Sequence, residues 1–157
     1  MNLIKPQSVA MPPSPLTEPE RRTLRCAVAL MIPASAKHDL PGADDETIFA
    51  DIVRSLGRDA RAVREALALL DALGAAPLDS LSAPQQMAVV QRLRQEHALL
   101  CHTLANVTTR CYYRDERTML SLGMQARPPF PLGFSVEEGD WSLLDPVRQR
   151  PPLYRPV

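Results

Sequence analysis

The chain has 157 residues, the length of one ordinary domain. Its 18 Lys and Arg residues balance 18 Asp and Glu residues, so no basic excess favours binding to nucleic acid or to an anionic membrane. No apolar run approaches the roughly 18 residues of a membrane-spanning helix. Three cysteines suit neither a disulfide scaffold nor a CxxC metal site.

Proline divides the chain into three parts. The 16 prolines outnumber the six glycines, and many of them lie in residues 1–15 and 124–157. Proline has a fixed φ and no backbone N–H, so both ends are excluded from long regular elements. Residues 16–123 are rich in Ala and Leu. We therefore predict an all-α fold: a small bundle of about five helices over residues 16–123, an irregular N-terminal arm at residues 1–15 and an extended C-terminal arm at residues 124–157.

The first helix is predicted to begin at Thr17, because Thr is a good N-cap residue and Glu20 is spaced to complete a capping box with it. Pro19 falls in the first turn, where proline is tolerated, and Pro33 ends the element. We therefore expect a capped helix between Thr17 and Pro33.

Two further helices follow in the predicted order. The acidic residues 44–46 suit a helix N-terminus, where the dipole favours negative charge, and Gly57 follows the apolar stripe of this helix as its C′ residue. Asp59 is the candidate N-cap of a third helix, and Gly74 is predicted to terminate it.

The remaining helical pattern begins at a second capping-box signature, Ser82 with Gln85. From there helical character runs through Leu93 and Leu104 to Tyr112. A short last helix is expected around residues 115–122. No stretch alternates apolar and polar residues with the period of a strand, so no sheet is expected.

Motifs for phosphate binding and for catalysis are absent: the chain holds no GxGxxG, GxxxxGK[ST], HExxH or GxSxG. His97 and Cys101 are four positions apart and could place two metal ligands side by side. Further ligands would have to come from His38, His102 or Cys111. A half-buried His beside a small apolar Cys is the favoured interpretation, so we expect no metal site.

Two other patterns have a functional and a structural interpretation, and we favour the structural one for each. Arg21-Arg22 precedes the apolar run 26–32, as in a twin-arginine export signal, but acidic residues crowd the arginines and the run is short. The acidic pairs at 44–45 and 137–138 could serve as general acid and base, but adjacent carboxylates usually lie on a solvated surface. We expect no catalytic or cofactor-binding residue in this chain.

Three motifs in the first third of the chain resemble the opening of a known bacterial family. They are Leu16-Thr17-x-x-Glu20-Arg21-x-Thr23-Leu24, Ile32-Pro33-Ala34-Ser35 and Pro41-Gly42-Ala43-Asp44. The family is the small-subunit family named after gluconate 2-dehydrogenase subunit 3, in which a first helix ends in an I-P-A segment and a P-G-A turn starts the second. The pair Tyr112-Tyr113 and the segment 128–134 are similar to later parts of that family.

The resemblance implies a small accessory subunit with no cofactor and no enzymatic activity of its own. Its partner would be a large FAD-containing oxidoreductase of the glucose–methanol–choline type, which oxidises hydroxyl groups of sugars or alcohols and which the small subunit helps to mature. Some such complexes add a multihaem cytochrome subunit. Many family members carry a twin-arginine signal, whereas residues 1–15 here are polar and proline-rich. We therefore expect a cytoplasmic protein, with export alongside the partner as the alternative.

Aromatic residues gather towards the C-terminal end, since Phe49 is the only one in the first 111 residues. Trp, Tyr and Arg dominate the hot spots of protein interfaces, and an irregular arm that carries aromatics needs a surface to lie on. The predicted partner-binding residues are Tyr112, Tyr113, Arg127, Phe130, Phe134, Trp141 and Tyr154. Three alternatives remain: the arm folds back on its own helices, the arm is disordered, or the chain is a free-standing helical protein that homo-oligomerises through the arm.

Overall fold

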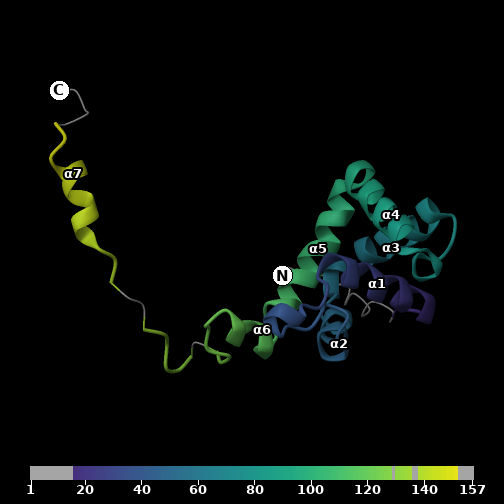
Figure 1. Cartoon of the computed structure of the whole chain (residues 1–157), viewed down its shortest axis with the longest axis horizontal. Coiled ribbons are helices and arrows are strands. Elements are labelled where there is room, and N and C mark those ends of the chain that lie inside the picture. Colours follow the sequence, from purple (N-terminus) through teal and green to yellow (C-terminus); the bar gives the residue numbers. More distant parts are fainter. Residues whose placement is uncertain (1–15, 129, 136–137, 152–157) are drawn as a thin grey trace, which may run out of the picture. The chain divides into compact units, whose positions relative to one another are not determined.

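The computed structural model describes residues 16–128, 130–135 and 138–151 (Figure 1). These residues contain seven α-helices and no β-strand. The helices are α1 (Glu18–Met31), α2 (Glu46–Arg54), α3 (Ala60–Gly74), α4 (Ala83–Glu96), α5 (Ala98–Tyr112), α6 (Glu116–Ser121) and α7 (Asp145–Arg148). Short 3-10 helices are η1 (Ala36–His38), η2 (Gly57–Asp59), η3 (Leu78–Ser80) and η4 (Trp141–Leu144). The chain divides into two units between Ala126 and Arg127.

The all-α prediction is confirmed, but the predicted number of about five helices is wrong, because the described residues hold seven. One of the two additional helices arises where the long helix expected from Ser82 to Tyr112 breaks at His97, which has φ −135° and ψ 52°. No Gly or Pro marks this position. The helices on either side, α4 and α5, both pack on α3 and on each other, so tertiary packing overrides the local helix preference.

The second additional helix is α7, which lies in the segment that we expected to be extended. Pro146 stands in its first turn, where the missing N–H of proline has no intrahelical partner to lose. Asp140 caps η4 just upstream by accepting a hydrogen bond from the backbone N–H of Ser142 at 3.0 Å. Proline here therefore limits the length of the helix without preventing it.

The predicted starts of α1, α2 and α4 are capped by side chains, whereas Asp59 stands at the N-cap position of α3 without a capping hydrogen bond from its side chain. Thr17 and Glu20 form the capping box of α1, with the backbone N–H of Thr17 2.7 Å from the Glu20 carboxylate. Asp45 caps α2 by accepting from the backbone N–H of Thr47 at 3.1 Å. Ser82 begins α4 with a second capping box. These helix starts follow from local hydrogen bonding alone.

The core of the first unit is built around α3, which packs against α1, α4 and α5. Its apolar face, with Val63, Leu67 and Leu70 at helical spacing, is almost completely buried. Among the described residues, the largest fully buried side chain is Phe49 of α2. The other fully buried residues of high volume are Leu24, Val28, Ile48, Ile52, Leu78, Leu93, Leu104 and Val107.

The end of α3 differs from the expected stop at Gly74. Gly74 is the last helical residue, and the next residue, Ala75, takes the left-handed conformation with φ 55°. A Cβ on Gly74 would lie 2.8 Å from Cδ1 of Leu81 and 3.5 Å from Cγ2 of Val89. The missing side chain therefore allows the side chain of Leu81, in the loop before α4, to approach α3 closely. The left-handed conformation is adopted by Ala75 instead of a glycine.

The described residues of the second unit have local structure, but η4 and α7 bury none of their residues. Upstream of these helices, Arg127 donates hydrogen bonds to the carbonyl oxygens of Pro128 at 3.3 Å and Gly133 at 2.7 Å. Its guanidinium carbon lies 4.5 Å from the ring centroid of Phe134. Across the described part of the chain, no helix has the length and apolar character needed to span a membrane.

Candidate functional site

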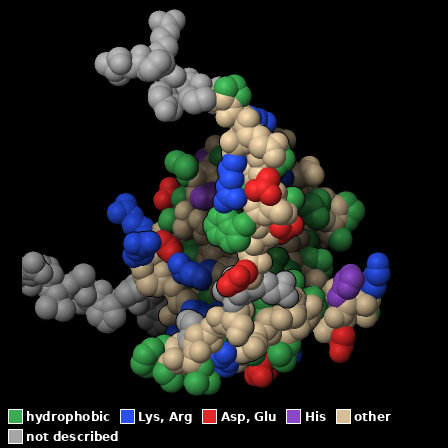
Figure 2. Space-filling model, turned by 90° about the vertical axis from the view of Figure 1, so that its left-hand side faces the viewer, with side chains coloured by type: hydrophobic (Ala, Val, Ile, Leu, Met, Phe, Trp, Pro, Cys, Tyr) green, Lys and Arg blue, Asp and Glu red, His purple; other side chains and the backbone are tan. Residues whose placement is uncertain are grey.

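Large exposed apolar side chains are concentrated in the second unit. Of the thirteen that the described residues contain, seven belong to it: Phe130, Leu132, Phe134, Trp141, Leu143, Leu144 and Val147. Figure 2 shows hydrophobic side chains on the surface of one face of the molecule, among charged ones. Single exposed apolar residues are ordinary, whereas runs of them mark interaction sites. We call these seven residues the arm surface.

Arg127 and Phe134 shape the first part of the arm surface. The guanidinium group stacks on the Phe134 ring and bonds the carbonyl of Gly133, so the two ends of this short segment are held together. Phe130 between them is 85% exposed. Three of the predicted partner-binding residues thus lie in one local element, with Phe130 as the side chain most accessible to a partner.

Trp141 lies in a separate helical element, where it is 66% exposed. Sequence reasoning weighed only aromatics and arginine, and therefore missed its apolar neighbours Leu143, Leu144 and Val147. The signal that would have found them is the cap residue Asp140 followed by apolar residues at helical spacing. The remaining predicted residue of this arm, Tyr154, lies outside the described residues.

The two predicted tyrosines of the first unit have different environments. Tyr112 is 5% exposed and belongs to the core, while Tyr113 is 56% exposed. Their rings meet edge to face, with centroids 5.4 Å apart. The hydroxyl of Tyr112 donates a hydrogen bond to the carbonyl of Pro41 at 3.2 Å. This burial favours a structural role for Tyr112 and leaves Tyr113 as the accessible member of the pair.

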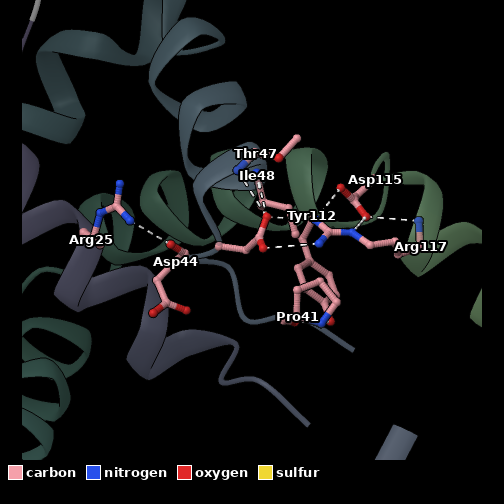
Figure 3. Close-up of polar contacts among 9 residues, drawn as sticks. Arg25, Pro41, Asp44, Thr47, Ile48, Tyr112, Asp115 and Arg117 are labelled. Carbon is pink, nitrogen blue, oxygen red and sulfur yellow. Dashed lines mark hydrogen bonds and ion pairs between the residues drawn. The ribbon is translucent and has the colours of Figure 1, made fainter. Parts of the chain in front are cut away.

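Two of the three motifs that carry the family resemblance, the I-P-A segment and the P-G-A turn, lie against each other beside that contact. The backbone N–H of Ala43 donates to the carbonyl of Ile32 at 2.9 Å, which joins the P-G-A turn to the I-P-A segment. A Cβ on Gly42 would lie 2.9 Å from the backbone N of Ala34, so glycine is needed for the approach. The hydroxyl of Tyr112 donates its hydrogen bond to the same turn, at the carbonyl of Pro41 (Figure 3).

A second polar cluster joins α2 to α6 and the end of α5. Arg117 donates to Asp45 at 2.8 Å and to Asp115 at 3.0 Å (Figure 3), and Arg114 donates to Asp51 at 2.9 Å. The hydrogen bonds from Arg117 lower the pKa of Asp45 and of Asp115. The hydrogen bond to Asp51 raises the pKa of Arg114. All five groups are therefore charged at neutral pH.

An open cavity of about 840 Å³ lies beside this cluster. Its charged lining consists of Asp51, Arg54, Arg114, Asp115, Glu116 and Arg117. The three guanidinium groups and three carboxylates balance, and both Arg114 and Arg117 already donate to carboxylates. An anion would have to displace those carboxylates, so the arrangement is that of a structural ion-pair network rather than a binding site.

His97 and Cys101 do not share a helix in the way we expected, because His97 is the residue at which α4 ends and α5 begins. The described residues contain no group of three His, Cys, Asp or Glu side chains placed to hold a metal ion. Burial raises the pKa of the Cys26 and Cys111 thiols, which favours the unreactive thiol over the nucleophilic thiolate at neutral pH.

Comparison with known proteins identifies no family for this chain. No protein-family model, curated protein or solved structure matches the chain. The family resemblance therefore depends on the motifs of residues 16–45, and the candidate functional site is the arm surface.

Proposed function

We propose that this chain is a non-catalytic accessory subunit that binds, matures and stabilises a large FAD-containing oxidoreductase of the glucose–methanol–choline type. The binding role depends on one observation: the seven residues of the arm surface are exposed although their segments have defined local structure. Apolar side chains held in this way are buried only when the segment meets another surface. A partner protein provides that surface.

The identity of the partner depends on the resemblance of residues 16–45. Support comes from the contact between its motifs, since the I-P-A segment, the P-G-A turn and the Tyr112 hydroxyl form one hydrogen-bonded assembly. A subunit that contributes binding rather than chemistry needs no titratable cluster. Its charged groups can therefore serve as structural ion pairs, as Arg117 does with Asp45.

The proposal predicts a neighbouring reading frame for an FAD-containing oxidoreductase of this type, and co-expression of the chain with that oxidoreductase is the test. The full chain is expected to yield a yellow heteromeric complex that oxidises sugar or alcohol hydroxyls with an artificial electron acceptor. A chain that ends at Ala126, and so lacks the second unit, is expected to keep its helical circular dichroism but to lose the flavoprotein on a sizing column. Cell fractionation then separates a cytoplasmic complex from one exported alongside the partner.

Three outcomes contradict the proposal in different ways. If the flavoprotein is stable and active without this chain, the chain is not an accessory subunit of that flavoprotein. A colourless homodimer formed through the arm supports the free-standing helical protein instead. If residues 1–126 lose their helical signal when the second unit is removed, the arm packs on its own helices and is not a partner-binding segment.

A further inference from the structure

We propose that residues 140–150 are a helical docking element with one apolar face, which enters a groove on the flavin-containing partner. The face is made by Trp141, Leu144 and Val147, with Leu143 at its edge. The inference rests on the proposed function for the identity of the partner. It adds the mode of binding, since a helix in a groove replaces the extended arm that the sequence predicts.

The helical conformation of this element is built by local contacts. Oδ1 of Asp140 accepts hydrogen bonds from the backbone N–H of Ser142 at 3.0 Å and from its hydroxyl at 2.6 Å. The 3-10 helix η4 ends at Leu144, and α7 begins at the next residue. The backbone N–H of Gln149 then bonds the carbonyl of Asp145 at 3.1 Å. A preformed helix loses less conformational entropy on docking than an irregular chain.

The sequence spacing gives this element two faces. Residues three apart are neighbours on a helix, so Trp141, Leu144 and Val147 follow one another along one side; they are 66%, 41% and 54% exposed. The residues one position further on, Ser142, Asp145 and Arg148, follow one another along a polar side, where Asp145 and Arg148 form an ion pair of 3.2 Å. Amphipathic helices with such anchors bind apolar grooves.

The area of the face favours a groove on a larger protein over a second copy of the same element. The exposed parts of its three anchors amount to on the order of 300 Å² per chain, with the indole as the largest share. Two copies pressed face to face would bury on the order of 600 Å², well below the roughly 1,200 Å² at which stable interfaces begin. A groove can enclose the sides of the helix as well.

The charges along the element fix the polarity of the groove. Glu138 and Asp140 precede the apolar face, and Arg148 and Arg150 lie at its far end. The matching groove carries basic residues where the element begins and acidic residues where it ends. Rim charges of this kind set direction and association rate more than affinity, so the anchors supply the binding energy.

Trp141 makes the element directly observable, because it is the only tryptophan in the chain. A full chain labelled with 5-fluorotryptophan gives a single fluorine NMR signal, which the tryptophans of the unlabelled partner leave undisturbed. This signal is expected to shift when the labelled chain is titrated with the purified, flavin-loaded oxidoreductase. Concentrating the labelled chain alone is expected to leave the signal unchanged.

A matched pair of substitutions tests whether this face docks. Leu144→Glu places a charge in the centre of the apolar face and is expected to weaken binding to the oxidoreductase by about 30- to 1000-fold. Gln95→Glu introduces the same side chain at an exposed position of α4, outside the docking element, and is expected to change the affinity by less than about threefold. Helical circular dichroism of both full chains checks that the first unit remains folded.

A second pair of substitutions separates a helical from an extended mode of binding. Asp140→Asn keeps a good N-cap while removing the charge, and is expected to change the affinity by less than about threefold. Asp140→Ala removes the cap and is expected to weaken binding by about fivefold. If both variants bind like the unsubstituted chain, or both weaken binding equally, the element does not dock as a capped helix.

The remaining outcomes distinguish this inference from the proposed function. If the oxidoreductase binds the unsubstituted chain and Leu144→Glu with equal affinity, the docking element is wrong and the accessory role stands. If the oxidoreductase does not bind the chain at all, the proposed function fails, and the docking element fails with it. If the fluorine signal shifts when the chain alone is concentrated, the apolar face binds a second copy of the chain, and its assignment to the partner is wrong.

Discussion

Arg117 of α6 lies between two carboxylates that cap helices. It donates to Asp45, the N-cap of α2, at 2.8 Å and 3.2 Å, and to Asp115, the N-cap of its own helix, at 3.0 Å. Each carboxylate therefore accepts hydrogen bonds from both a helix N-terminus and a guanidinium group. The arrangement connects the starts of α2 and α6 through Arg117 and Asp45, which are 72 positions apart in the sequence.

Replacing Arg117 should loosen this connection without unfolding the protein. The side chain of Arg117 is half exposed, and ion pairs in such positions contribute modestly. We expect Arg117→Ala to lower the free energy of unfolding by about 0.5–1 kcal/mol, measured by urea titration. Arg94→Ala, which removes an exposed arginine of α4, is the control. An equal loss in both variants would mean that the contact with Asp45 contributes nothing.

The same cluster should make stability depend on acid. Hydrogen bonds from Arg117 lower the pKa of Asp45 and Asp115 below the ordinary aspartate value. For Asp51, burial acts to raise the pKa, but hydrogen bonds from Arg114 and Arg54 outweigh it and the net direction is down. A carboxyl group with a lowered folded-state pKa contributes stability that is present above its unfolded pKa of about 4 and is lost as pH falls through the folded value.

We therefore expect the urea midpoint to be insensitive to these carboxylates between pH 7 and 5 and to fall below about pH 4. Asp45→Asn should make the fall of the urea midpoint below pH 4 less steep, because the amide still caps α2 but no longer titrates. Glu65→Gln, a substitution at an exposed position of α3, should leave the pH dependence of the urea midpoint unchanged. If the urea midpoint of Asp45→Asn falls with pH as steeply as that of the unsubstituted protein, Asp45 does not contribute to the loss of stability in acid.

The left-handed residue at the end of α3 predicts a substitution that stabilises the protein. Ala75 has φ 55°, a conformation that costs an L-residue about 1–2 kcal/mol, while glycine adopts it freely. After allowing for the larger chain entropy of unfolded glycine, Ala75→Gly should raise the free energy of unfolding by about 0.5–1 kcal/mol. Ala72→Gly, inside the same helix, should lower it by about 1 kcal/mol. Two destabilising results in thermal unfolding would contradict the left-handed turn.

The paired tyrosines allow a comparison within one ring contact. Tyr112→Phe removes the hydroxyl that bonds the Pro41 carbonyl and should cost about 0.5–1.5 kcal/mol of stability. Tyr113→Phe removes an exposed hydroxyl and should stay within about 0.5 kcal/mol of the unsubstituted protein. Thermal unfolding of both variants gives the difference. If Tyr113→Phe proves the more destabilising, the core contact has been assigned to the wrong tyrosine.

The parts of the fold that local chemistry determines could be predicted from the sequence. Thr17, Asp45 and Ser82 begin helices because their side chains accept hydrogen bonds from nearby backbone or pair with an acid or amide three residues on. The break at His97 could not be predicted, because nothing in its neighbourhood disfavours a helix. The role of Gly74 could not be predicted for a related reason, because it depends on the close approach of the Leu81 side chain in the folded protein.

The candidate site was predictable only in part. The crowding of aromatics towards the C-terminal end indicates where a partner would bind, and Phe130 and Trp141 are exposed there. The same criterion also selected Tyr112, which is buried, because an aromatic ring serves a core as readily as an interface. The helix α7 was not predicted, because proline usually breaks a helix, whereas Pro146 stands in a first turn, where proline is tolerated.

The hydrogen bond between Tyr112 and Pro41 also bears on the order in which the protein is made. Its two residues are 71 positions apart, so the turn before α2 cannot gain this contact until the ribosome has produced the whole of α5. Domains form as their chain emerges from the N-terminal end. Residues 140–150 are synthesised after α5, so the proposed docking element leaves the ribosome only after both residues of this contact are available.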